Sequence, residues 1–504
     1  MRQQDEVGTL LTGVTGLDQV LRGGLPQGCL FLISGTPGTG KTTLAMQFLL
    51  QGVARGERCL YVTLSESKAE ITKIAVSHGW DLSKLNITEL VPSEKNLSSD
   101  AQLTVFNPSE FELGETTEAM IAAVDKYRPQ RVVLDSLSEL RLIAQHALRY
   151  RRQVLALKHF FSGRDCTVLM LDDRTGGTED DHLQSIAHGV VILEQTVNQF
   201  GAERRRMRVS KMRGVSFSGG YHDFAIRRGG LVAFPRLVAA THHAEFVEAE
   251  LPSGIPEFDA MLSGGLSMGT STLLLGPAGT GKSTVATQIA AAAAGRGQRA
   301  AIFIFDENAG TFRSRSRKLG IPVDDLLKAG MLTIQQIDPA EMSSGELVNQ
   351  VQRATAGTDP CGKPAKVVVI DSLNGYLNAM PEERYLTAQL HELLSYLGNL
   401  GVATVMCVTQ AGMIGNMQSP VDTTYLADNV ILFRYFEAAG MVRRAISVVK
   451  KRNGYHERTI RELDLNNHGV VIGEPLVDFH GILTGVPSYV GKQSNLVKKD
   501  ADAR

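Results

Sequence analysis

The sequence has almost no net charge, a formal −1, and it lacks a long apolar run and any paired-cysteine pattern. Its 52 basic and 53 acidic side chains nearly cancel, so nothing supports the sustained positive surface expected of a strong nucleic-acid-binding protein. No stretch approaches the roughly 20 uninterrupted apolar residues that a membrane span needs, and the opening MRQQDEVGTL has no apolar signal-like core. We therefore expect a cytoplasmic protein with reduced thiols and no membrane or nucleic-acid partner. The scattered cysteines, without CxxC spacing, are Cys29, Cys59, Cys166, Cys361 and Cys407.

What the sequence has instead is an internal repeat. Residues 13–28, GVTGLDQVLRGGLPQG, parallel residues 254–269, GIPEFDAMLSGGLSMG, and the two blocks start 254 − 13 = 241 residues apart. RVVLDSL and VSKMRG in the first half match VVVIDSL and VVKKRNG in the second, in the same order. A chain of 504 residues, 43% of them hydrophobic, is long enough for two or three domains. We interpret the chain as a tandem duplication with a first domain at 1–245, a second at 246–490, a polar linker at 241–254 and a short polar tail at 491–504.

Each half alternates strand-like and helix-like segments. Short β-rich runs such as CLFLIS, CLYVTL, RVVLDS and TVLMLDD are separated by helical stretches such as TTLAMQFLLQGVARG. This alternation is typical of a mostly parallel sheet with helices on both faces. The predicted fold class is therefore α/β, present twice.

Each half also contains a glycine-rich loop of the form G-x-x-x-x-G-K-[ST], placed between an apolar strand and a helix. In such a loop, backbone N–H groups wrap nucleotide phosphates, the lysine contacts the β/γ-phosphates, and the next hydroxyl binds Mg²⁺. No NKxD-like guanine-reading motif is present, so we expect ATP rather than GTP. Within GTPGTGKTT (35–43) and GPAGTGKST (276–284), the predicted nucleotide contacts are Gly35, Thr36, Gly38, Thr39, Gly40, Lys41, Thr42, Thr43, Gly276, Gly279, Thr280, Gly281, Lys282, Ser283 and Thr284. Of these, Thr42 and Ser283 are also predicted Mg²⁺ ligands.

An aspartate closes an apolar strand downstream of each loop. These residues are Asp135 in VVLDS and Asp371 in VVIDS. A carboxylate at this place can hold the hydration shell of Mg²⁺, and the alternative is a strand-end acid that caps the next turn. We predict both as metal ligands.

Further acids follow the strand that comes after each loop helix. The first half has Ser65 and Glu66 where the second has Asp306 and Glu307. Hydrolysis needs a group that orients or deprotonates water, so we predict Glu66, Asp306 and Glu307 as catalytic. Because Ser65 replaces one acid, we expect the two sites to differ in turnover.

With these motifs the chain resembles the KaiC-like ATPases of the RecA superfamily, over roughly residues 8–488. The resemblance implies a two-tiered ring, usually a hexamer, with ATP between neighbouring subunits. It also implies that the KMR and KKR segments reach a neighbour's γ-phosphate, where a cation stabilises the charge of the transferred phosphoryl group. Taken alone, such residues can also be a solvated strand edge, but their recurrence 450 − 211 = 239 residues apart favours a role at the nucleotide. The residues are Lys211, Arg213, Lys450 and Arg452.

Clock-type members of this family phosphorylate a Ser-Thr pair in the second half of a neighbouring copy. The matching stretch, DTTYLADNVIL, places Thr424 and Tyr425 at that pair, so the first hydroxyl is retained and the second sits on a longer, rigid ring. We predict Thr424 as a phosphorylation site, with a simple turn residue as the alternative. In the first half the positions hold Gln184 and Ser185, for which we predict no phosphorylation.

Partners follow from the same resemblance. Clock members bind KaiA through an extended tail, whereas the tail here, VGKQSNLVKKDADAR, is short and polar, so we do not expect a KaiA-type partner. A KaiB-like partner is an expectation by analogy alone.

Three functions remain open on the sequence. The first is an ATP-hydrolysing, autophosphorylating ring in signalling or timing, with ATP and Mg²⁺ as cofactors. The second is an ATP-gated scaffold without useful kinase activity. The third is a RecA-type DNA motor, whose only local support is AERRRMR at 202–208 and which lacks the amino-terminal zinc-binding cysteines of RadA-type repair proteins.

Overall fold

The computed structural model describes residues 8–90, 108–174, 180–197, 201–378, 386–410, 424–438, 440–483 and 488–490. The predicted tail at 491–504 lies outside these residues. The chain forms two compact units, Met1–Arg236 and Leu237–Arg504. The units divide nine residues before the boundary predicted from the repeat, because residues 237–246 pack on the second unit. Ala239 N–H, for example, donates to Glu392 of the second unit at 2.9 Å.

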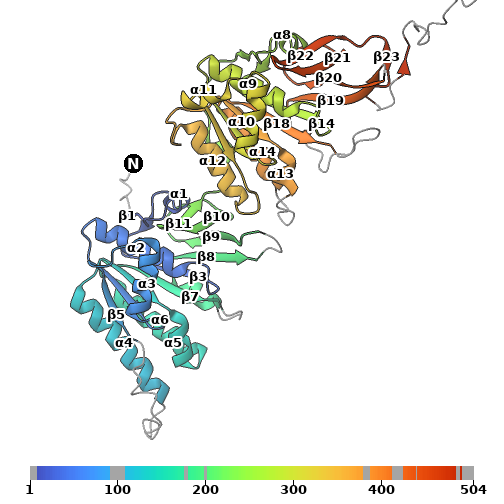
Figure 1. The fold of residues 1–504 in the computed structure, drawn as a ribbon. Helices are drawn as coiled ribbons and strands as arrows, with labels where there is room; N and C mark the ends of the chain where they lie inside the picture. The colour runs from blue at the N-terminus through green and yellow to red at the C-terminus, as the bar shows by residue number, and fades with distance from the viewer. Residues whose placement is uncertain are drawn as a thin grey trace, which may run out of the picture. The chain divides into compact units, whose positions relative to one another are not determined.

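The first unit is built on a nine-stranded sheet with the order β11-β10-β9-β8-β3-β7-β6-β4-β5 (Figure 1). The strands from β8 to β5 are parallel, and β9, β10 and β11 extend the sheet as antiparallel neighbours. The central strands are buried along their whole length, as expected for parallel strands covered on both faces. Their bounds are β3 Leu30–Gly35, β4 Cys59–Thr63, β5 Asn86–Glu89, β6 Arg131–Asp135, β7 Thr167–Asp173, β8 Gly189–Thr196, β9 Arg204–Met212, β10 His222–Arg227 and β11 Gly230–Phe234.

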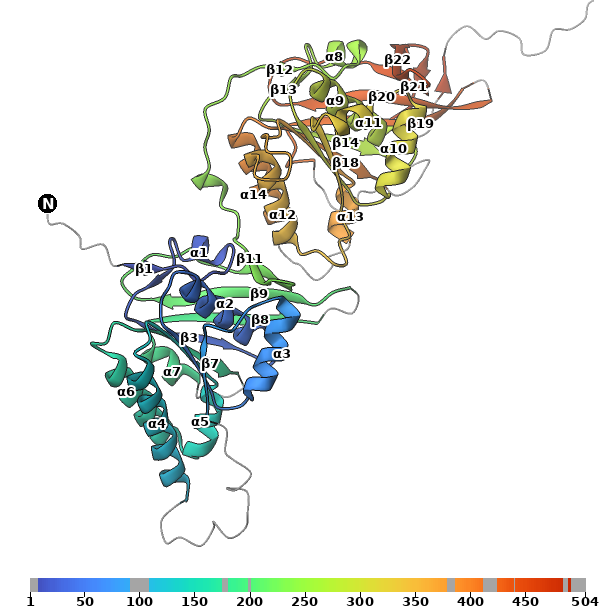
Figure 2. The same ribbon diagram turned by 60° about the vertical axis from the view of Figure 1, so that its left-hand side comes forward.

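Helices cover both faces of this sheet, as predicted. One core cluster joins the sheet to α2 and α3, and a second joins it to α4, α5 and α6. Figures 1 and 2 show α4, α5 and α6 grouped together. The helices are α1 Leu17–Val20, α2 Lys41–Ala54, α3 Lys68–His78, α4 Pro108–Tyr127, α5 Leu137–Ala144, α6 Ala147–Phe161 and α7 Asp180–Ile186, and a small pair of strands is formed by β1 Thr9–Leu10 and β2 Leu25–Pro26.

The second unit repeats this architecture. Its sheet has the order β16-β15-β17-β18-β14-β19-β20-β21-β22, the order of the first sheet written from the other edge. The strands are β14 Ser271–Gly276, β15 Ala300–Ile304, β16 Leu332–Gln336, β17 Val367–Asp371, β18 Ala403–Thr409, β19 Asn429–Ala438, β20 Met441–Lys451, β21 Ile460–Asn466 and β22 Gly469–Pro475. Two core clusters again lie on opposite faces. The fold class predicted from the sequence, two tandem RecA-like α/β domains, is confirmed.

Most helices of the second unit have counterparts in the first, and α11, between α10 and β16, is an addition. The alanine-rich α9 follows the second glycine-rich loop and packs with many small side chains buried, as its composition favours. The elements are η3 Ala239–Thr241, α8 Pro256–Met261, α9 Lys282–Gly295, α10 Ala309–Lys318, α11 Val323–Lys328, α12 Ser344–Ala356, α13 Leu373–Asn378 and α14 Leu386–Asn399, with short strands β12 Glu250–Leu251, β13 Leu266–Ser267, β23 Phe479–His480 and β24 Ser488–Tyr489. Among the described residues, no helix is both long and apolar enough to cross a membrane.

The strand order brings the predicted site residues to one edge of each sheet. In the first unit β3 lies between β7 and β8, and in the second β14 lies between β18 and β19. Parallel strands present their carboxyl ends at the same edge, where open α/β sheets bind ligands. The loops that follow β3, β4, β6 and β7 therefore converge on one place.

Candidate nucleotide sites

Each glycine-rich loop joins the central strand of its sheet to a helix. The first loop leads from β3 to α2, which begins at Lys41, and the second leads from β14 to α9, which begins at Lys282. The glycine before each lysine is in the left-handed region, with φ of 95° at Gly40 and 104° at Gly281, a conformation that favours glycine. The first N–H groups of each helix lack partners within the helix, so each loop offers donors to an anion.

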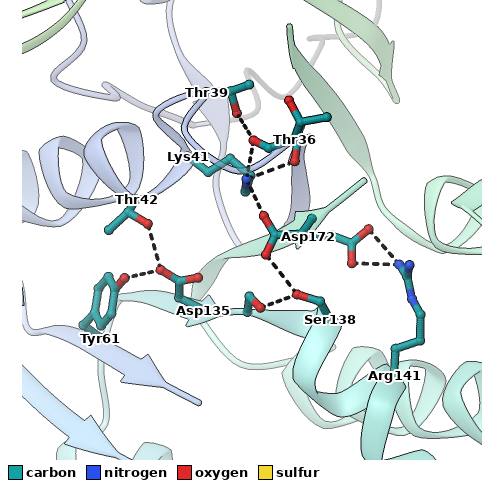
Figure 3. Close-up of polar contacts among 12 residues, drawn as sticks. Thr36, Thr39, Lys41, Thr42, Tyr61, Asp135, Ser138, Arg141 and Asp172 are labelled. Carbon is teal, nitrogen blue, oxygen red and sulfur yellow. Dashed lines mark hydrogen bonds and ion pairs between the residues drawn. The ribbon is translucent and has the colours of Figure 1, made fainter. Parts of the chain in front are cut away.

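Both loop lysines are buried beneath their loops. Lys41 donates to the carbonyl oxygens of Gly35 and Thr36 at 2.9 and 3.0 Å. Figure 3 shows Lys41 beside Thr36. Lys282 makes the corresponding contacts at 2.8 and 2.7 Å. The other predicted loop contacts lie in the same segments, with Thr43 and Thr284 buried and with Thr39 and Thr280 donating back to loop carbonyls at 2.8 and 2.9 Å.

The structure brings the predicted Mg²⁺ ligands of the first unit together. Thr42 Oγ1 donates to Oδ2 of Asp135 at 3.1 Å, and the Tyr61 hydroxyl donates to the same oxygen (Figure 3). Burial raises the pKa of Asp135, and these two hydrogen bonds oppose that shift. Hydroxyl and carboxylate oxygens are the hard ligands that Mg²⁺ prefers, so the donor set fits the predicted ion.

The second unit has the same pair with a different supporting group. Burial raises the pKa of Asp371, and hydrogen bonds from Ser283 and from the thiol of Cys407 oppose that shift. The donor set again fits Mg²⁺. Where the first unit supports its aspartate with a phenol from β4, the second uses a thiol from β18.

Glu66 lies at the carboxyl end of β4, where its backbone is fixed. Its N–H donates to Thr63 Oγ1 at 2.9 Å, and that hydroxyl donates to the Glu66 carbonyl at 2.8 Å. Oε2 of Glu66 is buried and has no hydrogen-bond partner among the described residues. Burial raises the pKa of Glu66, and the negative charges of Asp135, Glu70 and Asp173 raise it further. Such a carboxyl group is suited to accepting a proton.

The two acids of the second unit are both held by neighbours. The Ser372 hydroxyl donates to Oδ2 of Asp306. The Arg315 guanidinium on α10 lies 2.7 Å from Oε1 of Glu307. Burial raises the pKa of Glu307, and Arg315 opposes the shift. The two sites thus differ in structure at their acids, and unequal turnover stays a prediction.

The four basic residues of the KMR and KKR segments do not join the P-loop of their own unit. Lys211 pairs with Val190 in the β8–β9 ladder, and Val190 lies beside Leu32, before the end of β3 where the loop begins. The second unit repeats this, because Lys450 pairs with Val430 beside Leu273 of β14. The three residues from Leu273 to Gly276 rise about 10 Å, and the loop starts beyond them. Arg213 and Arg452 follow two residues further from the loop.

Thr424 lies at this same far end of the second sheet. It sits in a turn before β19, whose first residue Asn429 pairs with Thr272, the second residue of β14. Lys450 Nζ donates to the Thr424 carbonyl at 3.1 Å. Tyr425 is 57% exposed, in keeping with the long side chain expected there. In the first unit, Lys211 donates in the same way to the carbonyls of Gln184 and Ser185 at 2.7 and 3.2 Å.

Sequence reasoning missed several side chains at the sites. Asp173 at the end of β7 forms an ion pair with Lys41 at 2.6 Å. The run TVLMLDD could have indicated this residue, because it ends in an acid and forms the strand next to β3. Tyr61, Arg315 and Cys407 gave no such signal, because their roles depend on which neighbour each faces across strands or from a helix.

The chain was compared with known proteins. The family model for the KaiC ATPase matches residues 10–238 and again residues 251–477. The circadian clock oscillator protein KaiC of Acaryochloris marina is 27% identical over 514 residues, covering 96% of this chain and 92% of that protein. The circadian clock protein KaiC3 of Synechocystis is 27% identical, covering 97% of both chains, and KaiC of Prochlorococcus marinus is 27% identical, covering 99% of both.

The two family matches coincide with the two units and include both lysine, hydroxyl and aspartate sets. They cover most of the chain in tandem, as the repeat in the sequence predicts. The similarity also extends over nearly the full length of each relative. The chain therefore belongs to the KaiC family of ATPases.

Proposed function

We propose that this protein binds and hydrolyses ATP with Mg²⁺ at two sites in each chain, and that the second site also transfers a phosphoryl group to Thr424. The observation that carries the proposal is the duplicated set of a buried lysine, a hydroxyl and a strand-end aspartate at the carboxyl edge of each sheet. Each of these three groups has a recognised role in binding a nucleoside triphosphate and its metal ion.

The proposed assembly is a ring of six copies. The basic residues Lys450 and Arg452 lie at the end of the sheet opposite the P-loop of their own unit, so we place them at the nucleotide of another copy. Thr424 has the same placement. A ring, in which each copy meets its neighbour through two different faces, supplies such contacts to every site.

The chemistry at the second site uses the acids beside the loop. In hydrolysis, Asp306 or Glu307 accepts a proton from water as its oxygen bonds to the γ-phosphorus and ADP departs. In the kinase step, the Thr424 hydroxyl of the neighbouring copy replaces water, and the proton goes to the same carboxylate. In the first domain, Glu66 takes this role in hydrolysis.

The cellular role we propose is signalling or timing in the cytoplasm. It is supported by the names of the relatives, which are circadian clock proteins. A KaiB-like protein is the proposed partner, and a KaiA-type partner is not proposed. The balanced charge of the chain gives no support to a DNA-acting motor.

A second function, an ATP-gated scaffold without kinase activity, is favoured by two observations. Tyr425 replaces the second hydroxyl residue of the phosphorylated pair, and Glu307 is engaged by Arg315 at 2.7 Å. An ion-paired carboxylate is a weaker proton acceptor than a free one.

The experiment that separates these functions uses ATP labelled on the γ-phosphate. Purified protein is incubated with labelled ATP and Mg²⁺, and released phosphate and protein-bound label are followed together. Lys41→Ala and Lys282→Ala identify the contribution of each loop, and Thr424→Val removes the hydroxyl at nearly constant volume.

Label that is lost in both Lys282→Ala and Thr424→Val establishes the autokinase. Phosphate release without protein label leaves the ATPase-driven scaffold. No phosphate release by the unmodified protein under any tested Mg²⁺ concentration would overturn the proposal of two working ATP sites.

A further inference from the structure

The first P-loop lysine faces a carboxylate that has no counterpart among the described residues of the second unit. Asp173, the last residue of β7, places Oδ1 2.6 Å from Lys41 Nζ, and the two side chains are 29% and 8% exposed. At this distance and degree of burial the contact is a charge-assisted hydrogen bond. The cation that is predicted to hold the β/γ-phosphates therefore has an anionic partner within its own unit.

Neighbouring groups fix Asp173 in this position. Ser138 Oγ donates to its second oxygen at 3.1 Å, and Ser136 and Ser138 share a further hydrogen bond. The preceding residue, Asp172, is 1% exposed and is held by Arg141 through two contacts of 2.8 and 2.9 Å (Figure 3). Asp173 therefore contacts Lys41 as one member of a connected network of hydrogen bonds and ion pairs at the end of β7.

The strand registers identify the matching position in the second unit. Gly35 of β3 pairs with Asp173 of β7, and Gly276 of β14 pairs with Thr409 of β18. Thr409 is neutral, and its backbone N–H is bound by the Asn374 side chain at 2.6 Å. Among the described residues, no carboxylate lies within ion-pair distance of Lys282.

The local charges differ accordingly. Near the loop lysine of the first site, the charges of Asp172 and Arg141 cancel, and Glu70 is engaged by Ser67 in its capping box. The remaining groups are the carboxylates of Glu66, Asp135 and Asp173 against one cation, a formal balance of 1 − 3 = −2. In the second site Arg315 joins Lys282, giving 2 − 3 = −1 against the carboxylates of Asp306, Glu307 and Asp371. A polyphosphate that enters the first site meets the more negative surroundings.

We propose that Asp173 sets the nucleotide affinity of the first domain by competing with the nucleotide phosphates for Lys41. The first site then binds ATP more weakly than the second, and its binding depends more strongly on Mg²⁺, which neutralises the phosphates and the nearby carboxylates. This inference rests on the proposed binding of ATP at both sites.

The test measures equilibrium binding of a fluorescent ATP analogue to the full-length protein, with and without Mg²⁺. The first site is isolated by Lys282→Ala, and Asp173→Asn is added to remove the charge while keeping the shape. Removing a competing charged hydrogen bond is expected to tighten binding about tenfold, with the larger effect in the absence of Mg²⁺. Asp125→Asn, in an exposed ion pair, is the matched control and leaves affinity unchanged.

A second variant, which adds an acid to the second site, tests the inference even if the Asp173→Asn protein does not fold. Thr409→Asp in a Lys41→Ala background introduces the acid beside Lys282 and is expected to weaken the second site about tenfold. Circular dichroism and thermal melting verify that each variant is folded.

Equal or weaker binding by a folded Asp173→Asn protein overturns the inference, as does unchanged binding by Thr409→Asp. If instead neither site of the unmodified protein binds the analogue, the proposed function itself fails, and the inference fails with it. The two failures are distinguished by whether the unmodified protein binds nucleotide.

Discussion

Glu66 lies in the bend between β4 and α3, and Glu70 lies in the first turn of α3. The pKa values of their carboxyl groups are shifted in opposite directions. Burial and the neighbouring charges of Asp135 and Asp173 raise the pKa of Glu66. Hydrogen bonds from the backbone and hydroxyl of Ser67, both 2.8 Å long, lower the pKa of Glu70. The ionised form of Glu66 is therefore disfavoured by its surroundings. The ionised form of Glu70 is stabilised, because Glu70 belongs to the capping box of α3.

We predict that at about pH 8 Glu66→Gln raises, and Glu70→Gln lowers, the melting temperature of the first domain in calorimetry. A raised folded-state pKa means that ionised Glu66 costs stability, a cost that appears as pH rises through that pKa. A lowered folded-state pKa means that Glu70 contributes stability above its ordinary value of 4.5, which is lost as pH falls through the folded value. Both differences should shrink as pH falls. A lower melting temperature for Glu66→Gln at pH 8 would contradict the assigned environment.

At the residue scale the sequence predicted groups carried by a local motif and missed groups supplied by tertiary contact. Lys41, Thr42 and Asp135 follow from the spacing of a phosphate loop and from a strand-end acid, and the structure brings them together. Tyr61 reaches Asp135 from the neighbouring strand β4, and Arg315 reaches Glu307 from α10. No spacing rule encodes such contacts, because the side chain that faces a site depends on strand register and helix rotation.

At the scale of elements, one buried arginine ties three segments of the first unit together. Arg131, fully buried at the start of β6, forms an ion pair with Glu57 and donates to the carbonyl oxygens of Leu11 and Phe48 at 2.8 and 2.9 Å. It thus links the strand that carries Asp135 to α2, the helix that begins at the P-loop. Such a pair costs much to break, because the partner charge stays largely buried.

We predict that Arg131→Ala lowers the unfolding free energy of the first domain by about 3–5 kcal/mol. The matched control is Arg164→Ala, whose ion pair is about half exposed and should be worth about 1 kcal/mol or less. Denaturant titration followed by circular dichroism measures both. Equal losses in the two variants would mean that the buried pair has no special weight.

The elements themselves were predictable where periodicity was strong. The runs CLFLIS, CLYVTL, RVVLDS and TVLMLDD became the buried parallel strands β3, β4, β6 and β7, and the stretch after the first loop became α2. The antiparallel extension by β9, β10 and β11 was not predicted, since pairing direction depends on connections rather than on composition. The linker was predicted from polarity, yet residues in and just before it pack on the second unit, as the contact of Ala244 N–H with the Asn399 carbonyl at 3.1 Å shows.

At the scale of the whole molecule, the chain separates each proposed nucleotide site into two parts. The P-loop, the metal-binding aspartate and the acids lie at the carboxyl edge of the sheet, while Lys450 and Arg452 lie towards the amino end of β14. The same separation occurs in the first unit with Lys211. Because the two parts lie at opposite ends of the same sheet in both units, we expect each complete site to combine residues from two copies of the chain.

This leads to a prediction about mixed assemblies, made with Lys41→Ala in every chain so that only the second domain is active. Chains with Lys282→Ala have a defective P-loop but intact basic residues. Chains with both Lys450→Ala and Arg452→Ala have an intact P-loop but lack the basic residues. Each preparation alone should release little phosphate from ATP. Random mixing of equal amounts should restore about a quarter of the activity of the Lys41→Ala parent, because about a quarter of the neighbouring pairs combine an intact loop with intact basic residues.

Restoration should also require exchange of subunits between assemblies. The control is therefore a mixture of the two preparations that have each been assembled and cross-linked separately before mixing. A mixture no more active than the mean of its two components, despite demonstrated exchange, would place the basic residues outside the nucleotide site and leave the separation of the two edges without a catalytic purpose.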